Sequence, residues 1–533
     1  MKLIFKVKSI LKNDFKYVIF FLFFSAFFGL IEAYALYLVM PVVDIIQNLD
    51  TTIDDNKDYN LIIKFLIIII FLSFLNLIFI SSSNYFVNYI YAKLGFLFFQ
   101  ISMVSDKQEV LSKSINQQLN ENSRFAHAFL ISFITIISKL IVLFVIIFSM
   151  ISVEPVSSLI LIIFILFFYI IYFLFIKNFL KKSDLGRTRE YENLTSYLIT
   201  SFSIKEEIKV LRATDRILLK FKNSINLLKN FFFISKTFGQ YPRYIFEIII
   251  VSLILVILFN FQINFNLSVL GFYLYAFYRI IPSIQLLTLS YTQMYSNFYV
   301  VDNLFNFYSK INQHNKEEDE RKHIQKKYLS EELFVKNLDL SFNNSIGLNK
   351  ISFKIFNNKI NIIDGPSDSG KTTIIKALLK FNKFKSQGSI IYKGEAINDL
   401  NDLNIGYIPQ KSKLFHGSIL ENISLFSKEV DLSKIRNLIS LLNFDFINPY
   451  LNNDKPFNIY ELSGGETQKI CLLRSLYFQP DFLILDESLS EIDELTSKKI
   501  LDTLLGHLKI TLLITSHNEE FKKYYDSNII LIN

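Results

Sequence analysis

The stretch that decides the fold is GPSDSGKTT at residues 365–373. It follows the apolar residues 359–363, which predict a buried strand, and it precedes residues 374–379, which predict the start of a helix. In that setting, main-chain N–H groups and the helix N-terminus cradle phosphate groups. The pattern is G-x-x-x-x-G-K-[ST], and its fixed positions are filled by Gly365, Gly370, Lys371 and Thr372.

The motif assigns separate tasks to its side chains. Lys371 is predicted to reach the β- and γ-phosphates of a nucleotide, and the Thr372 hydroxyl to hold Mg²⁺. A chance match in a Gly/Ser turn is the alternative, and the motifs further along the chain exclude it. The other loop residues predicted to line the phosphates are Pro366, Ser367, Asp368, Ser369 and Thr373.

Four further motifs follow in chain order, and each lies at the predicted end of a strand or start of a helix. They are YIPQ at 407–410, LSGGETQK at 462–469, FLILDE at 482–487 and LLITSH at 512–517. Their order and spacing resemble the nucleotide-binding domain of ABC transporters, from about residue 333 onward. An LSGG sequence shortly before an apolar strand that ends in Asp-Glu is highly specific for that family.

Phosphoryl transfer depends mostly on positioning and charge neutralisation, and the motifs supply both. Asp486 is predicted to hold Mg²⁺ and Glu487 to polarise the attacking water. Gln410 is predicted to contact the metal and the water, and His517 the γ-phosphate. We therefore expect an active ATPase that uses ATP and Mg²⁺.

The resemblance also implies a second subunit. Asp493, in the sequence SEID at 490–493, is implied to face the site of the opposite subunit, and Phe342 to stack on adenine. An ordinary core position in a strand is the alternative for Phe342. The residues implied to act on the ATP held by the opposite subunit are Ser463, Gly464, Gly465 and Glu466.

Three positions depart from the family pattern, but none removes a catalytic group. Asp368 stands where the family usually has Gly, and its carboxylate is expected to disfavour phosphate binding. Glu466 replaces the usual Gln after LSGG, and Lys469 stands where Arg is common.

The composition of the first part of the chain is that of a membrane protein. Of 533 residues 51% are hydrophobic and 56 are Phe, with the apolar excess before residue 310. The net charge of +8 comes from basic loops that flank apolar segments, which is the positive-inside pattern rather than a nucleic-acid surface. The single cysteine, Cys471, excludes an internal disulfide and is expected to pack in a core.

Six apolar segments are close in length to the roughly 20 residues that a helix needs to cross a bilayer. Acidic or neutral loops alternate with basic ones, which places both termini in the cytoplasm. Residues 1–16 predict an amphipathic helix on the cytoplasmic face. The predicted spans are 17–43, 61–91, 125–150, 156–176, 244–259 and 267–287, the last continuing as a helix past Tyr308.

We therefore predict an α-helical six-span membrane domain at 1–313, a linker at 314–330 and an α/β P-loop ATPase domain at 331–533. This order resembles a half-transporter of the ABC exporter class, which implies a homodimer. Its coupling helices are expected around residues 107–114 and 205–214.

Patches of the membrane domain resemble, more finely, the bacterial lipid-linked oligosaccharide flippase of protein N-glycosylation. The patches are 20–46, Tyr-Pro-Arg at 241–243 and AFYRIIPS at 276–283. The resemblance implies a lipid-linked glycan as substrate and a bacterial cytoplasmic (inner) membrane as the location.

Charged residues inside the apolar runs give an independent hint. Each costs about 2.5–3.5 kcal/mol at a helix centre, so such residues usually face the interior of a helix bundle. Arg279, Arg243 and Lys139 are predicted to contact an anionic head group. The alternative is structural: Arg243 pairs with Glu247 four residues on, and Glu32 neutralises Arg279 or Lys139.

Two other functions compete with a lipid-linked glycan flippase. One is an exporter of peptides or hydrophobic small molecules, whose cavity would tolerate loss of the arginines. The other is a regulatory membrane ATPase that moves nothing.

Overall fold

The computed structural model divides the chain into two compact units. The first holds Met1–Ile101 and Lys113–Asn315, and the second includes Lys316–Asn533. The residues that the structure describes are 2–47, 55–104, 115–260, 267–318, 332–342, 345–366, 369–379, 385–397, 400, 403–451, 458–515 and 528–531.

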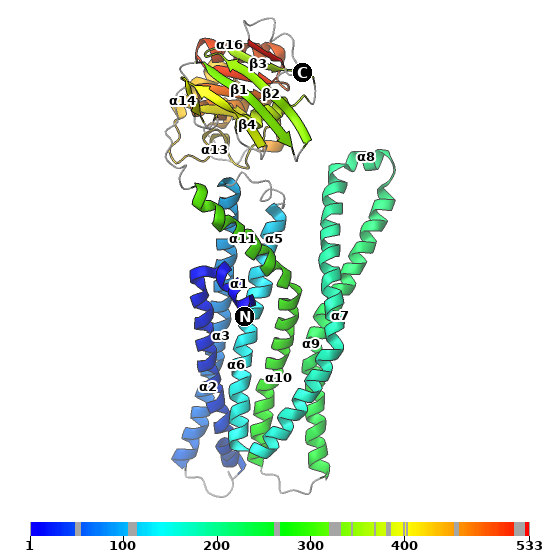
Figure 1. Ribbon diagram of the computed structural model, residues 1–533. Helices are drawn as coiled ribbons and strands as arrows, with labels where there is room; N and C mark the ends of the chain where they lie inside the picture. Colours follow the sequence, from blue (N-terminus) through cyan, green and yellow to red (C-terminus); the bar gives the residue numbers. More distant parts are fainter. Residues whose placement is uncertain are drawn as a thin grey trace. The chain divides into compact units, whose positions relative to one another are not determined.

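The first unit is built from long helices (Figure 1). They are α1 (Lys2–Leu11), α2 (Phe15–Gln47), α3 (Asp55–Val104), α5 (Ile115–Ser123), α6 (Ile131–Val153), α7 (Pro155–Ser203), α8 (Lys205–Val210), α9 (Thr214–Asn260), α10 (Leu267–Ser296) and α11 (Phe298–Glu318). Five segments among the described residues are long and apolar enough to cross a membrane. The predicted span 244–259 lies on α9, and the structure does not describe most of its side chains beyond Ile249. The number of six membrane spans therefore stays a prediction.

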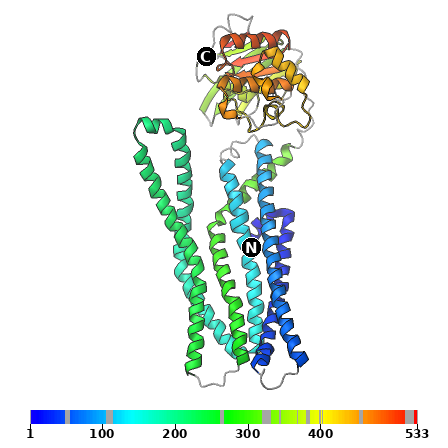
Figure 2. The same ribbon diagram turned by 180° about the vertical axis from the view of Figure 1, so that it is seen from behind.

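Helices α2, α6 and α10 pack against one another in this unit. Their buried contacts include Leu36, Ile146 and Phe272. Helices α7 and α9 run side by side and are joined at one tip by the short α8, as both views show (Figures 1 and 2). Helix α8 falls within the segment where a coupling helix was expected, whereas residues 107–114 lie outside the described part.

Local geometry differs from the expected uninterrupted helices in two places. A π-helical segment, Arg124–Leu130, separates α5 from α6 in the third predicted span. The last helix, expected to run past Tyr308, is interrupted at Asn297, whose side-chain amide donates to the Gln293 carbonyl at 2.7 Å. Such a side-chain bond competes with main-chain helix bonds. Helix α11 then continues to Glu318, into the segment predicted as linker.

The second unit is the expected α/β domain, with two sheets and a set of helices. The antiparallel sheet has the order β2-β1-β4-β5, and the parallel sheet has the order β6-β7-β8-β3-β9. The strands are β1 (Leu333–Phe342), β2 (Ser345–Ile355), β3 (Ile360–Asp364), β4 (Lys385–Tyr392), β5 (Glu395–Ile397), β6 (Ile405–Ile408), β7 (Phe482–Asp486), β8 (Thr511–Thr515) and β9 (Asn528–Leu531). The helices are α12 (Lys371–Leu378), α13 (Ile419–Ser424), α14 (Leu432–Leu442), α15 (Gly464–Tyr477) and α16 (Glu494–Gly506).

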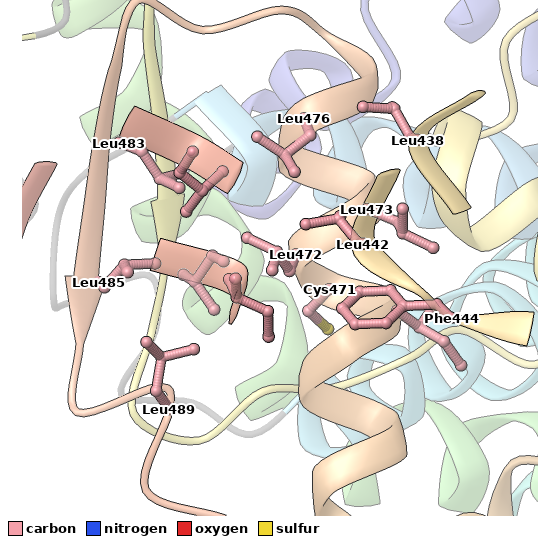
Figure 3. Close-up of a cluster of buried hydrophobic side chains, with 14 of the residues drawn as sticks. Leu438, Leu442, Phe444, Cys471, Leu472, Leu473, Leu476, Leu483, Leu485 and Leu489 are labelled. Carbon is pink, nitrogen blue, oxygen red and sulfur yellow. The ribbon is translucent and has the colours of Figure 1, made fainter. Parts of the chain in front are cut away.

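The parallel sheet is held by cores on both of its faces. Every residue of β7 and β8 is buried, as expected for parallel strands covered on both sides. On one side, Leu472 and Leu476 of α15 pack in the same cluster as Leu483 and Leu485 of β7 (Figure 3). Cys471 lies in this cluster with 5% of its surface exposed, which confirms the expected packed position, and burial raises the pKa of its thiol. This packing holds the ends of the strands in fixed positions.

Candidate nucleotide-binding site

The predicted motifs meet at one edge of the parallel sheet. Strands β6, β7, β8 and β3 are successive neighbours, and their carboxyl ends face the same edge, where ligands of open α/β sheets bind. Gln410 follows β6, Asp486 ends β7 and Thr515 ends β8, while Gly365 follows β3. The register pairs Asp486 directly with Thr515. The sheet thus brings together residues more than a hundred positions apart.

The phosphate-loop motif leads directly into α12. Gly370 is the N-cap and has a φ of 92°, a left-handed conformation that favours glycine. The ammonium of Lys371, which is 5% exposed, donates to the carbonyl oxygens of Gly365 at 2.8 Å and Pro366 at 2.9 Å. The buried hydroxyl of Ser369 has no partner among the described residues. A buried cation beside an unsatisfied hydroxyl fits an anionic phosphate chain.

Three hydroxyl groups surround the buried carboxylate of Asp486, which is 1% exposed. The Oγ1 atoms of Thr372 and Thr515 each donate to its Oδ1 at 2.9 Å. The Tyr407 hydroxyl is also hydrogen-bonded to Asp486, and burial together with this carboxylate raises the pKa of Tyr407 to about 12. Since all three donors are neutral, the carboxylate is positioned without a countercharge. Thr372 and Asp486, both predicted to hold Mg²⁺, are thus in direct contact, and their role toward the metal stays a prediction.

Glu487 is held by the neighbouring strands in a less common backbone conformation. Its φ is 50°, and its N–H donates to Thr515 through both the Oγ1 at 3.0 Å and the carbonyl oxygen at 3.2 Å. The carboxylate Oε2 accepts from Gln410 Nε2 at 2.7 Å. Two of the predicted catalytic residues are therefore in direct contact.

Thr515 and Tyr407 were not among the residues predicted to form the site. Their signal in the sequence is positional, because each lies at or near the end of a strand that flanks β7. That signal becomes readable only once the strand order is known.

The LSGG motif caps α15, a helix of 14 residues. Ser463 is the N-cap, and its hydroxyl accepts from the Glu466 N–H at 3.2 Å. The Glu466 Oε2 accepts in return from the Ser463 N–H at 2.9 Å and from its hydroxyl at 2.8 Å, and these bonds lower the pKa of Glu466. This is a capping box. A Gln would form the same box, so the departure from the family's usual Gln keeps the cap of α15 intact.

The SEID segment lies on the two glycines of the motif. A Cβ atom built on Gly464 would overlap Oε2 of Glu491, and one on Gly465 would lie 2.7 Å from the Glu491 carbonyl oxygen. Asp493 is the N-cap of α16 and accepts from the Thr496 N–H at 2.9 Å, which lowers the pKa of Asp493. The carboxylate of Asp493 thus has a structural role, while its predicted role toward a second site stays a prediction.

Some predicted site residues lie outside what the structure describes. They are Ser367, Asp368 and His517. Phe342 is the last residue of β1, but its side chain is not among those described, so its contact with adenine stays a prediction. Thr373 lies in the first turn of α12 and is half-buried.

The charged residues that the sequence singled out in the membrane unit fall into two groups. Arg279 Nη1 lies 3.5 Å from Glu32 Oε1, and Glu32 also interacts electrostatically with Lys139. Arg243 instead pairs with Glu247 at 2.9 Å on its own helix, the structural alternative that their spacing allowed. The structure therefore brings two of the three predicted substrate residues together.

Aromatic rings complete the surroundings of Arg279. Its guanidinium lies 5.5 Å from the ring centre of Tyr275 and 5.6 Å from that of Tyr278. It also donates to the Tyr275 hydroxyl at 3.2 Å. Cation–π contacts of this kind orient a guanidinium in apolar surroundings.

The fold and this site define a P-loop ATPase domain on the same chain as a helical membrane-type domain. The family model described as ABC transporter matches residues 348–490. The zinc import ATP-binding protein ZnuC of Buchnera aphidicola is 31% identical over 208 residues, which cover 37% of this chain and 79% of that protein. The chain therefore belongs to the ABC transporter family. Its ATPase domain couples ATP hydrolysis to transport.

Two further similarities concern the exporter arrangement. The putative export ATP-binding/permease protein RC1073 of Rickettsia conorii is 30% identical over 191 residues, which cover 34% of this chain and 33% of that protein. The structure of a bacterial Atm1-family ABC exporter with ATP bound superimposes with a TM-score of 0.65 at 16% identity, covering 98% of this chain and 94% of that one. The chain thus has the exporter-type fold.

Proposed function

We propose that the chain is an ATP-driven flippase that moves a lipid-linked oligosaccharide, or a similar amphipathic glycan lipid, across a bacterial cytoplasmic membrane. The carrying observation is the cluster formed by Glu32, Lys139 and Arg279. It contains two cations and one carboxylate, and Glu32 is 5% exposed. A positive excess in apolar surroundings is costly, and such residues usually serve a pathway for substrate or ions. It suits an anionic head group such as a diphosphate.

The nucleotide site supplies the driving force in this proposal. Thr372, Asp486 and Gln410 would hold Mg²⁺, which neutralises charge on the phosphates of ATP. Glu487 would orient the water, and His517 would contact the γ-phosphate. Two copies of the chain would form a homodimer, in which the LSGG motif of each copy acts on the ATP of the other. Closure of the two ATPase domains would then reorient the membrane helices.

The test is made with the purified chain in proteoliposomes. We expect a polyprenyl-diphosphate-linked sugar to stimulate ATP hydrolysis and to change leaflet, and a neutral polyprenyl glycoside to do neither. The variant is the double substitution Glu32→Gln with Arg279→Gln, which removes the ion pair and leaves Lys139 as the remaining charge of the cluster. We expect it to lose most of the stimulation, while the matched control Arg243→Gln keeps it.

The competing functions have distinct outcomes in the same assay. Equal stimulation by hydrophobic peptides, with no effect of the double substitution, would favour a peptide or small-molecule exporter. Hydrolysis that responds to no lipid or peptide, with no movement of any of them, would favour a regulatory ATPase.

A further inference from the structure

Glu491 places a carboxylate at the start of α15, beside the LSGG motif (the signature motif), where the proposed homodimer would bring the terminal phosphate of ATP. Its Oε2 occupies the space that a Cβ on Gly464 would need, so the carboxylate lies against the first residue of α15. Its main-chain carbonyl oxygen would lie 2.7 Å from a Cβ on Gly465. At Gly465 the close atom belongs to the main chain and only glycine leaves room for it, whereas at Gly464 the close atom is the end of a side chain.

The position of Glu491 is fixed by its backbone. Its N–H donates to Oε1 of Gln468 at 3.4 Å, and Gln468 is 3% exposed. The side chain of Glu491 is exposed, so its charge is accessible from solvent. Glu466, by contrast, already uses its carboxylate in the capping box at the same helix end. The start of α15 thus has two carboxylates beside it: that of Glu466 is hydrogen-bonded in the capping box, and that of Glu491 is exposed to solvent.

The negative charge of Glu491 affects phosphate binding because it lies at a helix N-terminus. Main-chain N–H groups at a helix start attract anions, and a carboxylate placed there competes with a phosphate for the same partial positive charge. The terminal phosphate of ATP and the Glu491 carboxylate also repel each other. Both effects act against nucleotide binding at the signature motif.

We propose that Glu491 weakens the binding of ATP to the signature motif and so raises the ATP concentration at which the chain hydrolyses. Each time a second copy brings its ATP to the motif, the Glu491 carboxylate either moves away from the two glycines or stays and repels the phosphate. Both cost free energy of binding. This inference rests on the proposed homodimer. It makes Glu491 a residue that sets nucleotide affinity rather than a catalytic residue.

The test compares Glu491→Gln with wild-type full-length protein in proteoliposomes. The substitution keeps the shape and removes the charge. We expect the ATP concentration for half-maximal hydrolysis to fall about twofold to fivefold, the range of charge effects at helix ends. The difference should shrink as salt is raised from about 0.05 M to about 0.5 M, because exposed charges are screened. Glu494→Gln, three positions further on and also exposed, is the matched control and should leave the value unchanged.

The outcomes separate this inference from the proposed function. An unchanged or higher half-saturating ATP concentration in Glu491→Gln would overturn the inference. So would a fall that salt does not alter, or an equal fall in Glu494→Gln. The proposed function is tested separately, by lipid movement and by its loss in the double variant at Glu32 and Arg279. If the wild-type protein moves no lipid-linked glycan, the functional proposal fails whatever Glu491→Gln does to the ATP requirement.

Discussion

Two buried carboxylates, one in each unit, are held in opposite ways. Asp486 in the ATPase domain accepts from the hydroxyls of Thr372 and Thr515, which are neutral. Glu32 in the membrane unit lies against the guanidinium of Arg279, and its Oε2 has no partner among the described residues. The first carboxylate keeps its charge for an incoming cation, whereas the charge of the second is already matched.

The difference follows from what each carboxylate has to do. Neutral hydrogen-bond donors fix a carboxylate in place and preserve its capacity to bind a metal. A buried charge pair exchanges that capacity for mutual neutralisation, and breaking it leaves an uncompensated charge. The ATPase domain therefore leaves its carboxylate open to a cation, whereas the carboxylate of the membrane unit is already paired with an arginine.

The largest expected effect is on Glu487, whose carboxylate is also held by a neutral donor, the Gln410 amide. Replacing Glu487 with Gln keeps its shape and removes the base, so we expect ATP hydrolysis to fall by about 10² to 10⁴-fold. Phosphate release by purified protein measures this, with Glu494→Gln as control. Hydrolysis within a few-fold of wild type would show that the charge of this residue is dispensable.

The second prediction breaks the charge pair of the membrane unit. Arg279→Met removes one of the two cations that offset the buried carboxylate of Glu32 and leaves Lys139, so we expect it to destabilise the protein by about 3 kcal/mol, the low end for a broken buried ion pair. Adding Glu32→Gln should recover most of that loss. Thermal unfolding of detergent-purified single and double variants provides the measurement. Equal losses in Arg279→Met and in the double variant would mean that the two side chains are not coupled.

The sequence predicted much of the ATPase domain because its signals are local. The loop from Gly365 to Thr372, the buried strand that ends at Asp486 and the helix that begins after Ser463 each follow from short patterns. The exporter-type fold was also predicted, from the apolar segments followed by these motifs. These features depend on neighbours in sequence, and periodicity and capping chemistry report them directly.

The contacts that the sequence could not predict depend on arrangement in space. Thr515 and Tyr407 reach Asp486 because β7 lies between β6 and β8, an order that no local pattern contains. The choice between Arg279 and Lys139 as the closer partner of Glu32 likewise depends on how α2, α6 and α10 pack. The interruption at Asn297 needed knowledge of one side-chain hydrogen bond.

A third prediction compares the two ends of one strand. Thr515→Val removes the hydroxyl between Asp486 and Glu487, and Thr511→Val removes one that donates to Asn357 at 2.6 Å and accepts from the Asn358 N–H at 2.8 Å. Both threonines are fully buried, so each substitution should cost about 1–3 kcal/mol.

Only the substitution at the site should change function. We expect Thr515→Val to require more Mg²⁺ for half-maximal hydrolysis, because Asp486 loses one of its positioning donors, and Thr511→Val to leave that requirement unchanged. A titration of hydrolysis against Mg²⁺ checks this, alongside thermal unfolding. If both variants shift the Mg²⁺ requirement equally, the effect belongs to the stability of β8 and not to Asp486.

The smallest expected effect comes from the second arginine pair of the membrane unit. Arg243 and Glu247 form an ion pair at 2.9 Å, shorter than that of Arg279, but their side chains are 47% and 43% exposed. Exposed pairs contribute little to stability, so Arg243→Gln should leave the unfolding temperature within experimental error. The comparison with Arg279→Met then isolates burial as the variable, since both substitutions remove an arginine from a carboxylate. A loss of stability or of lipid movement in Arg243→Gln, comparable to that of the variants at Arg279, would show that Arg243 belongs to the same cationic lining and that the wider site predicted from the sequence is correct.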